Sequence, residues 1–250
     1  MRPATIVAAA FCVLCTLPVL AEDASAGALE KARGAYEQRG DAAKAKAAFE
    51  LFQQAAKADP ASVEARWEGA RAAYFYGNYT KAEAPDSDKL AIFDAGISLA
   101  KEAVAIAPKS VEAHFWLGVL DGVYGEAKGI FKSLSMVPLI KQEMQACLDL
   151  DPTVEGYGPD RVLGRLYYKL PGFKGGDNKK SIEHLEKSLA GAPTDALTKL
   201  YLAEVYKSEG MKPKAIEQLK GVVAMTPDPR WVPEHPSIKA KAEKLLAKLQ

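Results

Sequence analysis

The residues best suited to chemistry are aromatic, arginine and acidic side chains that recur at helical spacing. Aromatic and arginine side chains combine a large contact area with directional hydrogen bonds, so they are typical anchors for binding partners. The alternative is that these rings only fill helix interfaces. On the face that a stack of helices would turn inward, the pattern predicts a ligand or partner groove of Trp67, Arg71, Tyr74, Phe115, Val119, Asp121, Arg165 and Tyr168, with Arg161, Leu200 and Glu204 on the same face.

Two arginines of this set indicate what the groove would hold. Arg71 and Arg165 are suited to gripping a carboxylate in bidentate fashion. We therefore expect a protein partner, or an apolar small ligand that bears a carboxylate.

Asp121 is the one acidic residue predicted to point inward. It falls four residues after Leu117, the place that Tyr167 occupies after Leu163. Burying a carboxylate without a partner is costly. We therefore expect Asp121 to accept hydrogen bonds from Arg or Tyr side chains; the alternatives are that it contacts a ligand or forms a proton-linked site. An enzyme using Asp121 would need a second acid or a nucleophile at defined spacing, and the sequence supplies neither. We expect no enzyme.

Other chemistries have weaker support. The three histidines, His114, His184 and His235, are scattered, so we expect no metal site and no cofactor. The glycine-rich stretch before Lys179 lacks the spacing of a phosphate loop, and Asp177 or Asn178 is better explained as a helix N-cap. The balance of 33 basic and 32 acidic residues over the whole chain removes the usual electrostatic argument for nucleic acid or for an anionic membrane.

The N-terminus has the pattern of a secretory signal peptide. Arg2 precedes an apolar run from Ile6 to Leu20, and Val19 and Ala21 are small residues at the positions a signal peptidase reads. We predict a signal peptide over 1–21, cleavage after Ala21 and a periplasmic or secreted protein. No later stretch is long and apolar enough to span a membrane.

The stretch from Pro193 to Pro227 predicts the fold. Two apolar helical faces flank Gly210, and the small Ala203 and Ala215 allow two helices to cross closely. The 34 residues between the two prolines match the tetratricopeptide pattern. We expect an all-α, right-handed α-solenoid of tetratricopeptide-like helix hairpins.

Proline closures of the same kind recur along the chain and divide it into units. They predict one domain over 22–250, with hairpins at about 28–59, 61–107, 109–151, 153–192 and 194–226, and a capping helix at 237–250. Two insertions interrupt the repeats. We expect 76–88 to be an ordered surface loop, and the glycines between Gly122 and Leu134 to mark close backbone packing or a bend before a helix from Leu139.

Two motifs resemble known families. The run Leu163 to Gly172 followed by Gly175-Gly176 is similar to the T-component of tripartite ATP-independent periplasmic (TRAP) transporters. The run Gly125 to Ile140, continuing to Asp151-Pro152, is similar to the regulator of microtubule dynamics proteins. The first resemblance implies a periplasmic helical protein that binds a solute-binding subunit and can form a homo-oligomer. A general scaffold and a transporter accessory protein both remain open.

Overall fold

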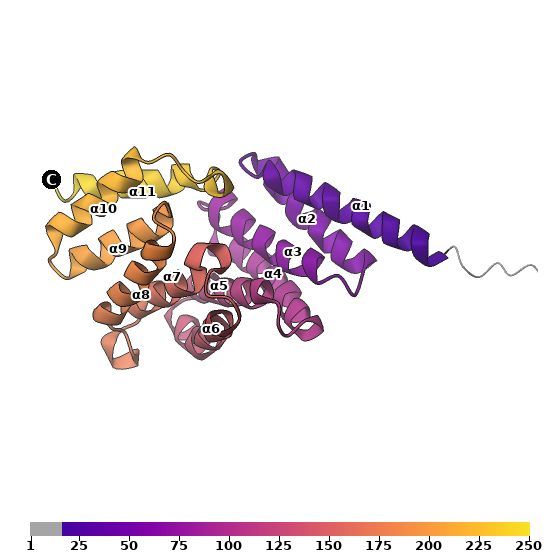
Figure 1. Cartoon of the computed structure of the whole chain (residues 1–250), viewed down its shortest axis with the longest axis horizontal. Coiled ribbons are helices and arrows are strands. Elements are labelled where there is room, and N and C mark those ends of the chain that lie inside the picture. Colours follow the sequence, from indigo (N-terminus) through magenta and orange to yellow (C-terminus); the bar gives the residue numbers. More distant parts are fainter. Residues whose placement is uncertain (1–16) are drawn as a thin grey trace, which may run out of the picture.

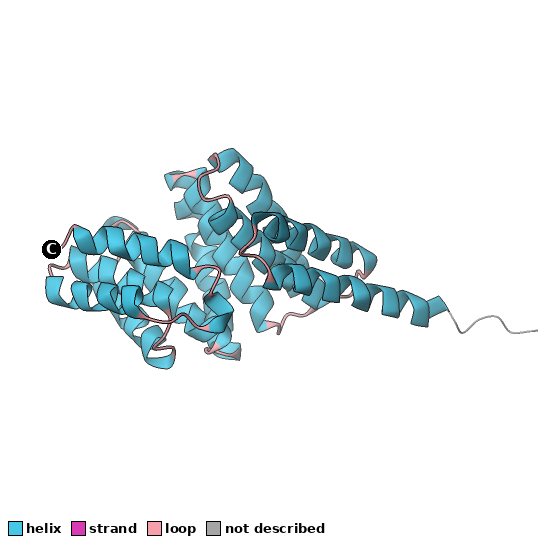
Figure 2. Cartoon of the chain, turned by 90° about the horizontal axis from the view of Figure 1, so that it is seen from above, coloured by secondary structure: helices cyan, strands magenta, loops and turns pink. Residues whose placement is uncertain are grey.

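The computed structural model is an array of antiparallel helix pairs (Figures 1 and 2). It describes the backbone of residues 17–250 and the side chains from Ala26 onward, and over this range it contains no strand. The all-α solenoid prediction is confirmed. The α-helices are α1 (Leu17–Glu37), α2 (Ala42–Ala58), α3 (Val63–Phe75), α4 (Asp86–Ile106), α5 (Val111–Lys128), α6 (Ile130–Leu150), α7 (Val154–Lys169), α8 (Asn178–Gly191), α9 (Ala196–Ser208), α10 (Lys212–Ala224) and α11 (His235–Ala247).

The predicted signal peptide is not covered by this description. Residues 1–16 lie outside the described residues, and the expected cleavage point after Ala21 falls within α1. Within 17–250, no helix has the combination of length and apolar character that a bilayer crossing requires.

Hydroxyl and carboxylate side chains start several helices. Ser62, Ser110 and Asp195 each accept a hydrogen bond from the backbone N–H three residues further on, at the beginnings of α3, α5 and α9. Asp177 caps α8 in the same way, which identifies it as the N-cap in the glycine-rich stretch. These caps satisfy backbone donors that no helical carbonyl can reach.

Small residues set the distance between the helices of a pair. A Cβ added at Gly118 would lie 2.5 Å from the Met144 side chain of α6, and one at Gly164 would lie 2.6 Å from Leu185 of α8. Ala203 and Ala215 are fully buried at the corresponding crossing of α9 and α10. The close crossing inferred from Ala203 and Ala215 is thus repeated along the stack.

The two insertions are more helical than expected. Residues Tyr76–Thr80 form a π-helical turn (η1) that extends α3, and Tyr76 and Gly77 are buried, so the expectation of a surface loop over 76–88 is wrong for its first part. In the second insertion, α5 continues to Lys128 and α6 begins at Ile130 rather than at Leu139. Gly125 packs against the backbone of Ser133, and Gly129 makes the turn with φ of +104°.

An ion pair joins the two ends of the array. Arg39 follows α1, and its Nε and Nη2 atoms donate to the two carboxylate oxygens of Glu234 at 3.0 and 3.2 Å. Both residues are buried, and Nη2 also donates to the carbonyl of Arg230 in the 3-10 turn η3 (Pro229–Trp231) at 2.5 Å. The loop after α1 therefore lies beside the chain leading into α11, as Figure 1 shows. We call this contact the Arg39–Glu234 clasp.

We predict that Gly164→Ala destabilises the protein although alanine favours helices. The added Cβ would meet Leu185 and, at 3.0 Å, the backbone oxygen of Ser181, so the pair α7–α8 must separate. We expect the free energy of unfolding in urea to fall by about 1 to 3 kcal/mol. The matched control is Gly34→Ala in α1, where nothing lies within 4 Å. It should gain up to about 1 kcal/mol, and equal effects at both positions would contradict the packing argument.

Candidate functional site

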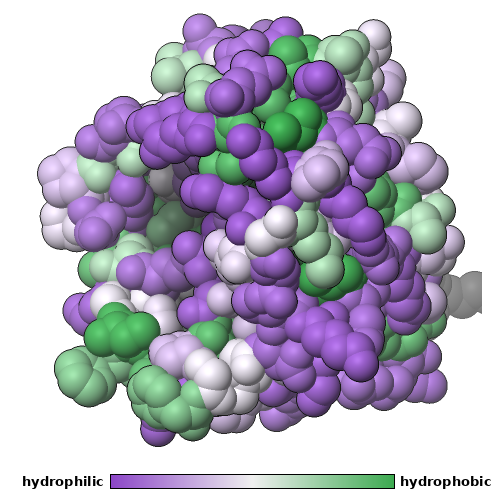
Figure 3. Space-filling model, turned by 90° about the vertical axis from the view of Figure 1, so that its left-hand side faces the viewer, coloured by the Kyte–Doolittle hydropathy of each residue, from purple (hydrophilic) through white to green (hydrophobic). Residues whose placement is uncertain are grey.

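A cavity of about 630 Å³ lies on the concave side of the array. Figure 3 shows the hollow on the face that bears the C-terminal helices. Its walls come mainly from α3 with η1, α5, α6, α7, α9 and α11. It lies where two hydrophobic cores meet, because the N-terminal core extends to Leu163 of α7 and the second core begins at Leu185 of α8.

Most of the wall is apolar. Aliphatic side chains of α5 and α6 face those of α7 and α9, and aromatic rings of α3 and α5 close one side. Tyr74 and Trp116 pack with ring centroids 5.5 Å apart. The principal apolar lining residues are Tyr74, Phe115, Trp116, Val119, Val123, Val137, Leu166, Leu197, Leu200 and Tyr201.

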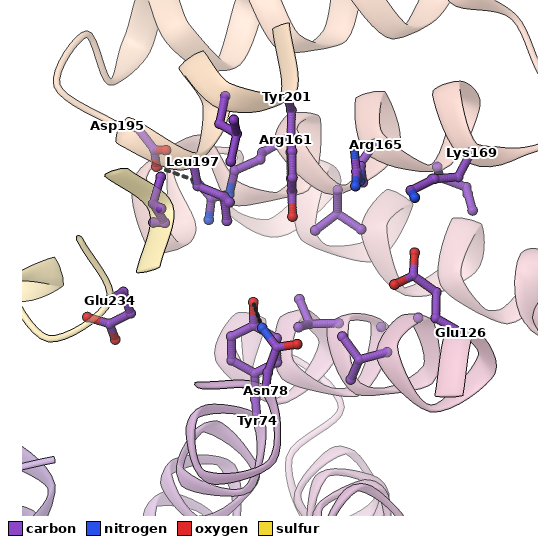
Figure 4. A pocket seen from close by; sticks show the side chains of 18 of the residues that line it. Tyr74, Asn78, Glu126, Arg161, Arg165, Lys169, Asp195, Leu197, Tyr201 and Glu234 are labelled. Atoms are coloured by element: carbon purple, nitrogen blue, oxygen red, sulfur yellow. Dashed lines mark hydrogen bonds and ion pairs between the residues drawn. The ribbon is translucent and has the colours of Figure 1, made fainter. Parts of the chain in front are cut away.

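Three basic residues of α7 form a row along one wall. Arg161, Arg165 and Lys169 are four residues apart, so they project from successive turns (Figure 4). Arg161 Nη1 donates to Asp195 Oδ2 at 2.7 Å, and Arg165 forms an ion pair with Glu204 while its guanidinium lies 4.2 Å from the Tyr201 ring centroid. Both arginines are therefore already neutralised.

Lys169 differs from the two arginines. It is exposed, and within the described part of the chain it forms no ion pair. Glu126 of α5 lies across the cavity from it, whereas Glu234 lies toward the other end (Figure 4). Lys169 is thus the cation of the row that is available to a ligand.

Arg161 also holds an unusual backbone turn. Glu155, Gly156 and Tyr157 all have left-handed φ angles of 50, 65 and 57° at the start of α7. A left-handed helical conformation costs roughly 1–2 kcal/mol for each non-glycine residue. Arg161 offsets this by donating to the carbonyls of Glu155 and Gly156 at 3.1 and 3.3 Å, which assigns its guanidinium a structural role.

The structure brings together half of the predicted site residues. Tyr74, Phe115, Val119 and Arg165 line the cavity, as do Arg161, Leu200 and Glu204 of the projected face.

The other four do not line it. Arg71 lies 4.4 Å from the Tyr36 ring centroid and 5.0 Å from that of Trp67, and it pairs with Glu68. Trp67 therefore packs beside Arg71, and Tyr168 packs against the second core. Asp121 is 2% exposed and lies outside the lining.

Sequence reasoning did not select several lining residues. Tyr201 follows Leu200, which also lines the cavity, so the predicted inner face of α9 was one position too narrow. Lys169 follows Tyr168, which does not line the cavity, so on α7 the prediction was off by one position. Asn78, whose Nδ2 donates to the Tyr74 hydroxyl at 3.4 Å, reaches the cavity only because η1 continues α3. No spacing rule for an ordinary hairpin would have placed it there.

Asp121 lacks the Arg or Tyr hydrogen bond that we expected. Its Oδ1 is buried without a partner, so burial raises its pKa from 3.8 to about 6; Lys101 opposes this shift and Glu143 adds to it. Glu143 is itself bonded to His114 Nδ1 at 2.6 Å. The Asp121 carboxylate is thus a buried group on α5. The described residues contain no cluster of three His, Cys, Asp or Glu that could hold a metal ion.

We predict that Asp121→Asn stabilises the protein at neutral pH. Because the folded-state pKa is raised, the wild-type free energy of unfolding falls as pH rises from about 4 to 6, and the loss is complete above this window. The variant should match the wild type near pH 4 and exceed it by about 1 to 3 kcal/mol at pH 7.5. Urea unfolding at both pH values measures this, and a difference independent of pH would refute it.

Comparisons with known proteins give a family and a fold. The family model of regulator of microtubule dynamics protein 1-3 matches residues 28–170, more than half of the chain. A search of curated protein sequences returned no match.

Solved structures share the architecture at low identity. TTC0263, a thermophilic TPR protein of Thermus thermophilus, superposes with a TM-score of 0.63 at 19% identity, covering 89% of this chain and 99% of its own. The pilF protein of Pseudomonas aeruginosa gives a TM-score of 0.55 at 15% identity, covering 92% and 93%. At these identities the likeness establishes the fold alone. With its paired helices and the match over residues 28–170, the chain belongs to the regulator of microtubule dynamics protein 1-3 family and has a divergent tetratricopeptide fold.

Proposed function

We propose that the chain is a non-catalytic binding protein whose concave cavity receives the apolar part of a ligand. The observation that carries this proposal is the contrast between apolar walls and arginines that are already paired. A cavity of about 630 Å³ lies within the size range of small-molecule sites. The hydrophobic effect is then the main source of affinity.

The carboxylates around the cavity support a binding role over catalysis. Four of the five carboxylates are each bonded to an arginine, and Glu126 is exposed; the four are Asp195, Glu204, Asp228 and Glu234. A general acid or base needs a carboxyl group that is free to exchange a proton with the substrate. Tyr74 does not serve either, because burial raises the pKa of its hydroxyl well above the ordinary value.

Lys169 would orient the ligand within the cavity. It is the unpaired cation at one end of the row on α7, opposite Glu126. A ligand with a carboxylate would place this group at Lys169 and its apolar part between α5 and α9. This replaces Arg71 and Arg165, which the sequence favoured as the carboxylate grip.

A second candidate is a scaffold for a protein partner, such as a solute-binding subunit in the periplasm. It is favoured by the location of the cavity on the concave surface of a helical-repeat fold, where such folds present extended binding faces. In this case an apolar segment of the partner occupies the cavity. Export through the predicted signal peptide and a homo-oligomeric state belong to this proposal.

We predict that Val123→Trp blocks the cavity. Val123 lines it but is only partly buried, so the larger ring extends into the open space without displacing the core. Binding of cis-parinaric acid, a fluorescent long-chain carboxylic acid, should weaken at least tenfold, about 1.4 kcal/mol. Leu150→Trp at the exposed end of α6, outside the lining, is the control and should bind as the wild type does.

A second variant tests the direction of binding. Lys169→Gln should weaken binding of the acid by about three- to tenfold and leave binding of the corresponding alcohol unchanged, because only the charged group gains from the lysine. Unchanged binding of the acid in Val123→Trp would refute the ligand proposal. If the wild type binds no probe but does bind a purified solute-binding protein, and Val123→Trp abolishes this, the scaffold is correct instead.

A further inference from the structure

Two phenylalanines project into solvent, one at the start of α6 and one in the connection between α7 and α8. Phe131 is 88% exposed and Phe173 is 85% exposed, although such rings normally contribute to a core. Phe131 follows the Gly129 turn between α5 and α6, and Phe173 is in the 3-10 turn η2 (Gly172–Lys174) between α7 and α8. Exposed apolar groups of this size indicate an interaction surface when they gather in one region.

Both turns flank the same end of the cavity. Glu126 and Lys169 face each other there (Figure 4), and the chain runs from them directly into the segments that carry Phe131 and Phe173. Ile130 and Pro171, next to these segments, line the cavity. In Figure 3, exposed hydrophobic side chains gather at one corner of the face that shows the hollow. We call the segments 126–132 and 169–180 the mouth patch.

The mouth patch is strongly basic although the whole chain is nearly neutral. Its acidic residues are Glu126 and Asp177, and Asp177 already caps α8. Within the described residues, none of its lysines forms an ion pair. The mouth patch has six lysines and two acidic residues, whereas the whole chain has a net charge of only +1. The six are Lys128, Lys132, Lys169, Lys174, Lys179 and Lys180.

The residue types favour a lipid surface over a protein. Lysine is depleted in protein interfaces, where arginine and tryptophan anchors in packed pockets dominate. The mouth patch contains lysine and no arginine, and its phenylalanines lie at the start of α6 and in η2. Basic residues around inserted aromatic rings are typical of anionic membrane surfaces, where each lysine contributes about 1 kcal/mol.

We propose that the mouth patch docks the chain onto an anionic lipid bilayer, with Phe131 and Phe173 inserted between the headgroups. The surface of the bilayer would then meet the open end of the cavity. This proposal does not depend on what the cavity holds, because it rests on the exposed rings and the lysines alone.

Tryptophan replacements in the full chain report insertion at each position. Phe131→Trp and Phe173→Trp should shift their emission to the blue and be quenched by brominated lipids in vesicles of equal phosphatidylglycerol and phosphatidylcholine. Ile106→Trp, at an exposed position of α4 outside the mouth patch, is the control and should show neither change. The N-terminal apolar run is common to all three variants, so it cannot produce a difference between them.

A binding measurement gives the magnitude. Phe131→Ser combined with Phe173→Ser should reduce co-sedimentation with the same vesicles about tenfold relative to Ile106→Ser. Half-molar salt should reduce the binding of the wild type, since lysine contacts are screened. Quenching equal to the Ile106→Trp control, or equal co-sedimentation of all variants, overturns the proposal. Emission that responds to a purified partner protein but not to vesicles overturns it in favour of a protein interface.

Discussion

The close crossing of paired helices is the constraint from which the rest of the structure follows. At Gly118, Gly164 and Ala203 the side chain is no larger than a methyl group, and the facing helix occupies the space that a longer side chain would need. The small residue has the same place in α5, α7 and α9, the first helices of their pairs, so each of these three helices turns the corresponding face inward. The cavity is the result of this repetition.

The arginines on the wall of the cavity are paired within the protein and are not available to a ligand. Arg161 and Arg165 lie on the wall, but Asp195 and Glu204 neutralise them, and Arg161 is further used to hold the left-handed turn at 155–157. Removing a charge from water is costly unless its hydrogen bonds are made elsewhere. The wall therefore combines paired arginines with a surface on which apolar contacts dominate, and in the row on α7 it is Lys169 that keeps its charge available.

The sequence was sufficient for the helices, for the pairing and for the positions of half of the site residues. Periodicity and small residues are local properties, so they place Tyr74, Phe115, Val119 and Arg165 on the inner face, and all four line the cavity. Arg71 does not line the cavity as predicted, because its guanidinium packs against the aromatic rings of Tyr36 and Trp67. The contribution of Asn78 required the π-helical turn, and the contact of Arg39 with Glu234 joins residues 195 positions apart. No spacing rule reaches that far.

The Arg39–Glu234 clasp limits how this protein can evolve. An open repeat array can gain or lose a unit at small cost, because each unit contacts only its neighbours. Here the two ends meet, and the insertion or deletion of one hairpin would carry Glu234 away from Arg39 by the width of a repeat. It would also leave two buried charges without partners. A change in the number of hairpins would therefore cost more here than in an open array, whereas a change in the length of an exposed loop would leave the ion pair in place.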